Sequence, residues 1–184
     1  DQHTSFAAQP GMMERTVTVN GVSKGFAMTG WRIGYIAAPQ WIAAACTKLQ
    51  GQFTSGASGI SQKATAEAMN GGGALAADMK AAFLTRRDLV IEGLRGIEGF
   101  KVNVPKGAFY IFPDVAALFG KSHGGHTIQS GQDLAMYLLE TADVATVGGD
   151  AFGSPHCIRI SYAASDEVLR EAIRRIAKAV GHLS

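Results

Sequence analysis

The chain has 184 residues, of which 47% are hydrophobic and 17% are charged, and its formal net charge is +2. This composition is typical of a packed globular protein and excludes general disorder. The net charge is too small to indicate nucleic acid or an anionic membrane as a partner. No run of about 18 apolar residues is present, so we expect no membrane-spanning helix.

The chain has only two cysteines, Cys46 and Cys157, which lie far apart and form no CxxC pair. We predict that each is a small buried hydrophobic residue rather than a disulfide partner or a nucleophile. Such cysteine usage suits a reducing compartment, so we expect a cytoplasmic protein.

The N-terminal part of the chain shows strand and helix patterns in turn. Two strands and then two helices are predicted, over residues 16–20, 31–38, 40–50 and 60–69. The second strand is almost continuously apolar and is therefore expected to be buried until Pro39 ends it. Pro39 also suits the start of the helix that follows. A run of glycines at 71–73 is the clearest break in the sequence.

The part after this break mixes helix and strand patterns. It predicts helices over 75–94 and 133–141, strands over 100–104, 108–112, 144–147 and 158–162, and a last helix capped by Ser165. The turn Pro105-Lys106-Gly107 is expected to join the first two of these strands as a hairpin. The glycine-rich stretch 121–131 is predicted to be a loop. The basic residues of the last helix are interpreted as its solvated face.

One segment, residues 21–35, carries a chemical pattern. Small residues surround a single lysine, Lys24, and Arg32 follows eight positions later. A neutral lysine amine forms an imine with an aldehyde, and burial in an apolar pocket or a nearby cation such as Arg32 would favour the neutral amine. The planar guanidinium of Arg32 suits phosphate oxygens. Taken without its surroundings, the pattern also fits a solvated Lys–Arg pair.

This segment resembles the pyridoxal-phosphate (PLP) attachment signature of class I aminotransferases. The wording SK…AMTGWRIGY is similar to the aspartate aminotransferase branch in particular. The resemblance implies that Lys24 holds pyridoxal 5'-phosphate as a Schiff base and later moves a proton between the substrate α-carbon and the cofactor. It implies that Arg32 binds the cofactor phosphate. The serine that the family often has three residues before the lysine is Gly21 here, so this phosphate contact differs.

A second stretch, residues 151–163, is similar to the FG…RISYA segment of the same family. By this match, Arg159 would bind the substrate α-carboxylate through a bidentate pair. From the residues alone, Arg159 stands inside an apolar strand and needs an anion, which a structural salt bridge would also supply. The GAFY stretch, residues 107–110, overlaps the predicted strand 108–112 and resembles the family as well. We interpret Phe109 and Tyr110 mainly as core residues.

The resemblance covers nearly the whole chain and implies an α/β fold, that of a fold-type I PLP-dependent transferase. Residues 1–74 would be the C-terminal part of the large PLP-binding domain, and residues 75–184 the small domain with its long connecting helix. A homodimer is expected by the same resemblance. The family's aspartate on the pyridine nitrogen and its tyrosine on the ring oxygen would precede Asp1. We therefore expect the parent enzyme, rather than this chain alone, to be active.

The predicted activity of the parent enzyme is transamination between an L-amino acid, with aspartate as first choice, and 2-oxoglutarate. Three alternatives remain open: a PLP lyase or synthase of the same fold, a non-catalytic aminotransferase-like domain of a transcription regulator, and an inert fragment. His123 and His126 lie in a loop with no supporting carboxylate or cysteine nearby, so no metal site is predicted.

Overall fold

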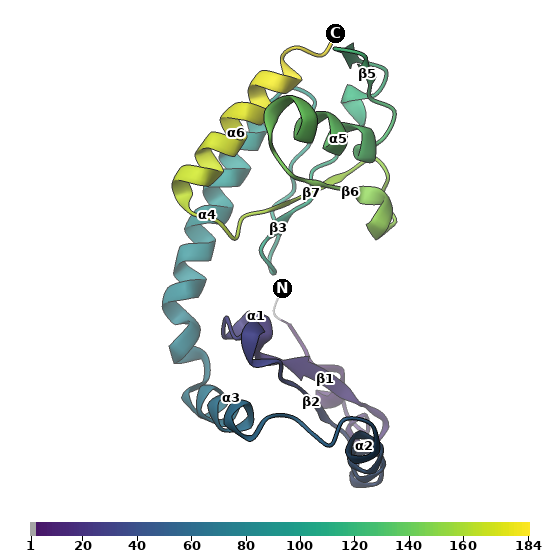
Figure 1. Cartoon of the computed structure of the whole chain (residues 1–184), viewed down its shortest axis with the longest axis vertical. Helices are drawn as coiled ribbons and strands as arrows, with labels where there is room; N and C mark the ends of the chain where they lie inside the picture. The colour runs from purple at the N-terminus through teal and green to yellow at the C-terminus, as the bar shows by residue number, and fades with distance from the viewer. Residues whose placement is uncertain (1–2) are drawn as a thin grey trace. The chain divides into compact units, whose positions relative to one another are not determined.

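A computed structural model describes residues 3–184 (Figure 1). The chain divides into two compact units, Asp1–Asp78 and Met79–Ser184, whereas the sequence suggested a boundary after residue 74. Each unit forms its own small antiparallel sheets. In the part of the chain that the structure describes, no helix has the length and apolar character needed to cross a membrane.

The first unit is built on a two-stranded antiparallel ribbon. Strands β1 (Thr18–Gly21) and β2 (Gly34–Ala37) pair from Thr18 opposite Ala37 to Gly21 opposite Gly34. Its helices are α1 (Val22–Gly25), α2 (Gln40–Phe53) and α3 (Gly59–Gly71), and its 3-10 turns are η1 (Phe6–Ala8), η2 (Met13–Arg15), η3 (Thr29–Trp31) and η4 (Gly72–Ala76). The second strand is shorter than predicted because η3 occupies its expected start.

The expectation that this second strand is buried is wrong. Ile36 is 37% exposed, and the α2 residues Trp41 and Phe53 are 73% and 82% exposed. Within the described residues β1 and β2 pair only with each other, so no further strand extends the ribbon. The buried apolar residues of this unit include Val22 and Ile33, which flank the connection between the two strands.

The second unit places three helices around a three-stranded antiparallel sheet of order β3-β7-β6 (Figure 1). Its helices are α4 (Ala77–Arg95), α5 (Gly131–Ala142) and α6 (Asp166–Val180), its strands are β3 (Tyr110–Ile111), β4 (Ser122–His123), β5 (His126–Thr127), β6 (Val147–Gly148) and β7 (Ile158–Ser161), and its 3-10 turns are η5 (Ala116–Leu118) and η6 (Gly149–Phe152). The helix α4 begins two residues before the boundary and continues into this unit. As predicted, the Ser165 hydroxyl caps α6, accepting a hydrogen bond from Val168 N at 3.4 Å.

A single apolar core holds this unit together. It includes Leu94 from α4, Leu134 and Leu138 from α5, Ile158 from β7 and Ile176 from α6, all 0–1% exposed. Because each helix contributes one apolar stripe to the same cluster, the sheet and the helices stabilise one another. The core therefore fixes the position of β7, which carries Arg159.

Two expectations about strand pairing are corrected. The hairpin between residues 100–104 and 108–112 does not form, because Tyr110 and Ile111 pair with β7 and only an isolated bridge joins Lys101 to Asp114. This pairing places Ile111 in the core, where it is 0% exposed. Conversely, the predicted loop 121–131 contains the short hairpin β4–β5.

The two cysteines behave differently. Cys157 is buried, as predicted, and burial raises the pKa of its thiol, with a smaller contribution from the charge of Asp114. Cys46 is exposed, so the prediction is wrong there; it lies on α2, which buries none of its residues. Neither cysteine forms a disulfide.

Tyr137 of α5 forms a hydrogen bond with the C-terminal end of α6. The side chain is 0% exposed, and its hydroxyl donates a hydrogen bond of 2.8 Å to Ala179 O. We expect Tyr137→Phe to lower the free energy of unfolding by about 1–2 kcal/mol, because a buried carbonyl loses its donor. Urea titration followed by far-UV circular dichroism measures this, and an unchanged midpoint would contradict the assigned bond.

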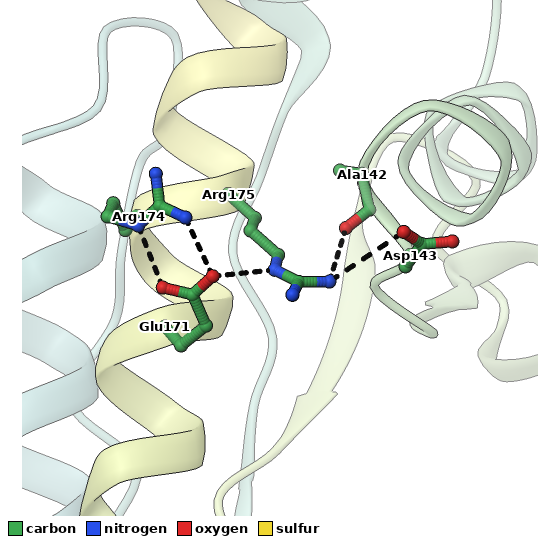
Figure 2. A network of polar contacts seen from close by, with 5 residues as sticks. All are labelled: Ala142, Asp143, Glu171, Arg174 and Arg175. Atoms are coloured by element: carbon green, nitrogen blue, oxygen red, sulfur yellow. Dashed lines mark hydrogen bonds and ion pairs between the residues drawn. The ribbon is translucent and has the colours of Figure 1, made fainter.

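A polar network links the same two helices on the surface (Figure 2). The Glu171 carboxylate accepts hydrogen bonds of 2.7 Å from both Arg174 Nε and Arg174 Nη2 and one of 2.8 Å from Arg175 Nε. Arg175 also reaches Ala142 O at 3.4 Å and the Asp143 carboxylate at 3.8 Å. The bonds from Arg174, and then those from Arg175, lower the pKa of Glu171 to about 2.

This pKa predicts how stability changes with pH. The folded pKa of Glu171 lies below its ordinary value of 4.5, so its contribution is complete above pH 4.5 and is lost as the pH falls toward 2. We expect Glu171→Gln to lower the urea midpoint near neutral pH and to flatten its dependence over this acidic range. Glu92→Gln, which removes an exposed α4 carboxylate outside the network of Figure 2, is the matched control for the loss of one negative charge.

Candidate functional site

Lys24 lies on the connection between the two strands of the N-terminal ribbon. Strand β1 ends at Gly21, and the single turn α1 follows at once, carrying the lysine on its third residue. Val22, which is 1% exposed, anchors this turn. Lys24 itself is exposed.

Arg32 lies at the other end of the same connection. It follows η3 and precedes β2, and its backbone is left-handed, with φ 55° and ψ 46°. Few residues other than glycine adopt this conformation without strain. The guanidinium is exposed and donates one hydrogen bond from Nη1 to Thr29 O at 3.0 Å.

The ribbon brings the two ends of this connection together. Gly21 and Gly34 are paired across the two strands, so the segment that carries Lys24 and Arg32 is a closed loop. A Cβ added to Gly21 would lie 3.2 Å from Ile33 O, which shows how closely the strand ends approach. The structure therefore presents an amine and a guanidinium on one glycine-bounded loop.

Arg159 belongs to the second unit and lies on the central strand β7. Its side chain is partly buried, and its guanidinium carbon lies 4.4 Å from the ring centroid of Tyr110 and 4.5 Å from that of Phe152. Within residues 3–184, no carboxylate forms a salt bridge with it. The structural salt bridge that the sequence left open is therefore not seen among the described residues.

The aromatic neighbours of Arg159 were not assigned a role from the sequence. Tyr110 was interpreted as a core residue, and Phe152 was noted only as part of the FG motif. The signal that could have found Tyr110 is the pairing of its strand with β7, but the sequence favoured a hairpin partner instead. Phe152 ends the turn η6, which a strand pattern does not reveal.

The two loop histidines lie elsewhere in this unit. His126 Nε2 is 3.4 Å from the Glu140 carboxylate, and the His123 ring lies 5.1 Å from that of His182. In the part of the chain that the structure describes, no three His, Cys, Asp or Glu residues are grouped so that they could hold a metal ion.

Comparisons with known proteins agree over nearly the whole chain. The family model for aminotransferase class I and II matches residues 2–176. The bifunctional aspartate aminotransferase and glutamate/aspartate-prephenate aminotransferase of Petunia hybrida is 53% identical over 182 residues, which cover 97% of this chain and 38% of the relative. An aspartate aminotransferase of Pinus pinaster is 50% identical and covers 97% of this chain and 37% of that relative.

Solved structures give the same result. The crystal structure of the aspartate aminotransferase from Rhizobium meliloti matches with a TM-score of 0.91 at 47% identity, covering 96% of this chain and 44% of that one. An aromatic aminotransferase from Pyrococcus horikoshii matches with a TM-score of 0.87 at 37% identity, covering 98% and 47%. The chain thus spans less than half the length of these relatives.

These matches confirm the predicted fold class, an α/β fold-type I PLP-dependent transferase. The cofactor predicted from the lysine segment, pyridoxal 5'-phosphate, is the cofactor of this family. The family match and the relatives, which are far above 30% identity, lead to one conclusion: the chain belongs to the aminotransferase class I and II family.

Proposed function

We propose that the full-length protein of this chain transfers the amino group of L-aspartate to 2-oxoglutarate with pyridoxal 5'-phosphate. The observation that carries the proposal is the closed loop between β1 and β2, which presents Lys24 and Arg32 together. Arg159, partly buried and without a carboxylate partner among the described residues, supports it from the second unit. The Petunia and Pinus relatives, which are aspartate aminotransferases by name, support aspartate as the amino donor.

The residues of the loop fit this cofactor. Lys24 supplies a primary amine for an aldehyde, and Arg32 supplies a planar cation for a phosphate. Gly25 and Gly30 have no atom within 4 Å of an added Cβ, so the loop leaves open space where a flat ring could approach the backbone. No side chain larger than a hydrogen is present at these two positions.

Each residue then has a defined task. When bound, PLP withdraws electrons from the amino-acid α-carbon and so makes its proton removable. Lys24 would hold the cofactor through its primary amine, and once the substrate amine has displaced it, the free Nζ would take the proton from the α-carbon, acting as the base. Arg32 holds the phosphate and so keeps the ring in place over repeated turnovers. Arg159 binds the α-carboxylate and orients the amino acid.

The second carboxylate of aspartate needs a further cation, and the loop 54–58 between α2 and α3 contains no lysine or arginine. A homodimer, in which a neighbouring subunit supplies this cation, is part of the proposal. Prephenate is a second candidate acceptor of the amino group, because the Petunia relative is also named a glutamate/aspartate-prephenate aminotransferase.

A direct assay tests the activity. The full-length protein with PLP should convert aspartate and 2-oxoglutarate to oxaloacetate and glutamate, while phenylalanine should be a poorer donor. Arg159→Leu should raise the KM for aspartate by about 100-fold or more, because one bidentate charge pair is lost. Release of ammonia or carbon dioxide without glutamate would instead identify a lyase. No turnover by PLP-loaded protein would contradict the proposal.

A further inference from the structure

Two aromatic rings contact the Arg159 guanidinium. The Tyr110 ring comes from β3 and the Phe152 ring from η6, and their centroids lie 4.4 and 4.5 Å from the guanidinium carbon. One ring comes from β3, which neighbours β7 in the sheet, and the other from the turn that follows β6, the second neighbour of β7. We call these two side chains the aromatic clamp.

The register of the sheet explains this arrangement. Tyr110 is paired with Ser161, two residues beyond Arg159 on β7, and it therefore lies diagonally across from the arginine on the same face of the sheet. On the other edge, Val147 of β6 is paired with Arg159, and the chain continues through β6 into the turn that ends at Phe152.

The clamp rings are themselves held. Phe109 lies against Tyr110 with ring centroids 4.5 Å apart, and Phe112 packs edge-on against Phe152 at 5.9 Å and 88°. A ring that is supported by another ring loses little further freedom when a cation binds to it. The orientation of the guanidinium is therefore built into the fold of the second unit.

This arrangement solves a problem that a salt bridge would create. A partly buried arginine needs compensation for its charge, but a protein carboxylate would occupy the N–H groups that a ligand must use. Ring faces attract the cation through its flat sides and leave the N–H edges available. The absence of a carboxylate partner among the described residues agrees with this division.

We propose that Tyr110 and Phe152 are positioning residues, which hold the Arg159 guanidinium in one plane so that a carboxylate can bind only along its edge. This inference rests on the proposed function, because it takes the substrate α-carboxylate as the ligand. It adds that the affinity of Arg159 for a carboxylate depends on the two rings as well as on the charge.

The test uses the whole 184-residue chain, labelled with ¹⁵N, and acetate as the probe. The Nε–Hε signal of Arg159 is assigned by its loss in Arg159→Lys. We expect ring currents to shift this signal upfield and its heteronuclear NOE to have the high value of a rigid group. Its chemical shift should change as acetate is added. Tyr110→Leu and Phe152→Leu should each weaken acetate binding by about five-fold and make the side chain mobile. Tyr110→Phe, which keeps the ring, should retain wild-type affinity and rigidity.

Phe119→Leu, which removes a core-packed ring away from the clamp, is the matched control, and the β7 amide signals report whether each variant is folded. Unchanged affinity and rigidity in both folded leucine variants would overturn the inference. So would a wild-type Arg159 signal without ring-current shift and with high mobility, a measurement that needs no variant. If acetate binds as expected while Lys24 captures no PLP, the proposed function fails and the clamp stands. If PLP is captured but acetate has no effect, the clamp is overturned.

Discussion

Replacing Lys24 with alanine should abolish covalent capture of PLP by this chain. The aldehyde can react with any neutral amine, but Lys24 shares a closed loop with the Arg32 guanidinium, which we propose holds the phosphate. Reduction with borohydride fixes the cofactor on the amine that bonded it, and peptide mass spectrometry then identifies the site. We expect the label on Lys24 in the wild-type chain and no labelled loop peptide in Lys24→Ala.

The matched control is Lys63→Ala, which removes another exposed lysine of the same unit. It should leave the labelling of Lys24 unchanged. Equal labelling of Lys24 and Lys63 in the wild-type chain would show that the reaction follows exposure alone, and the assignment of Lys24 would then be wrong. Far-UV circular dichroism establishes that both variants keep their secondary structure.

The role of Arg32 can be measured separately from that of Lys24 by comparing two ligands. Pyridoxal has the same aldehyde as PLP but no phosphate, so it uses the amine without the guanidinium. We expect Arg32→Gln to weaken PLP capture by roughly ten-fold, the loss of a charge-assisted pair, and to leave pyridoxal capture unchanged. An equal loss with both ligands would mean that Arg32 shapes the loop, through its bond to Thr29 O, rather than binding the phosphate.

The sequence was most informative where a local pattern decides the structure. The last helix was found because Ser165 caps it and its apolar residues recur at helical spacing, and both features need only neighbouring residues. The lysine segment was found because its residue types are chemically unusual. The pairing of β3 was missed because it depends on β7, some 50 residues later, whereas the turn at 105–107 suggested a nearer partner.

Exposure was harder to predict than secondary structure. The apolar run 31–38 has the composition of a buried strand, yet Ile36 is exposed because burial depends on what covers a strand and not on its own residues. The exposed Lys24 amine follows for the same reason. The aromatic neighbours of Arg159 could not be derived, since they come from two separate elements, β3 and η6, that only the folded sheet brings to β7.

Gly149→Ala should be strongly destabilising, with a loss of about 3–5 kcal/mol in the free energy of unfolding. A Cβ at this position would overlap the Ser154 carbonyl oxygen and lie 2.6 Å from the Cys157 carbonyl oxygen. Both are hydrogen-bonded backbone atoms, since Cys157 O accepts from Gly149 N at 2.8 Å and Ser154 O accepts from Cys157 N at 2.9 Å. Neither can move without breaking the start of β7.

Alanine substitutions at two other glycines distinguish the cost of this steric overlap from the cost of an unfavourable backbone conformation. Gly153 has a φ of +73° but open space around an added Cβ, so Gly153→Ala should cost only about 1–2 kcal/mol. Gly107 has neither constraint, and Gly107→Ala should be close to neutral. Urea titration followed at the amide signals of β7 measures all three, because both tryptophans, Trp31 and Trp41, lie in the other unit. If Gly149→Ala were no worse than Gly153→Ala, the close packing of η6 against β7 would be wrong, and with it the placement of Phe152 over Arg159.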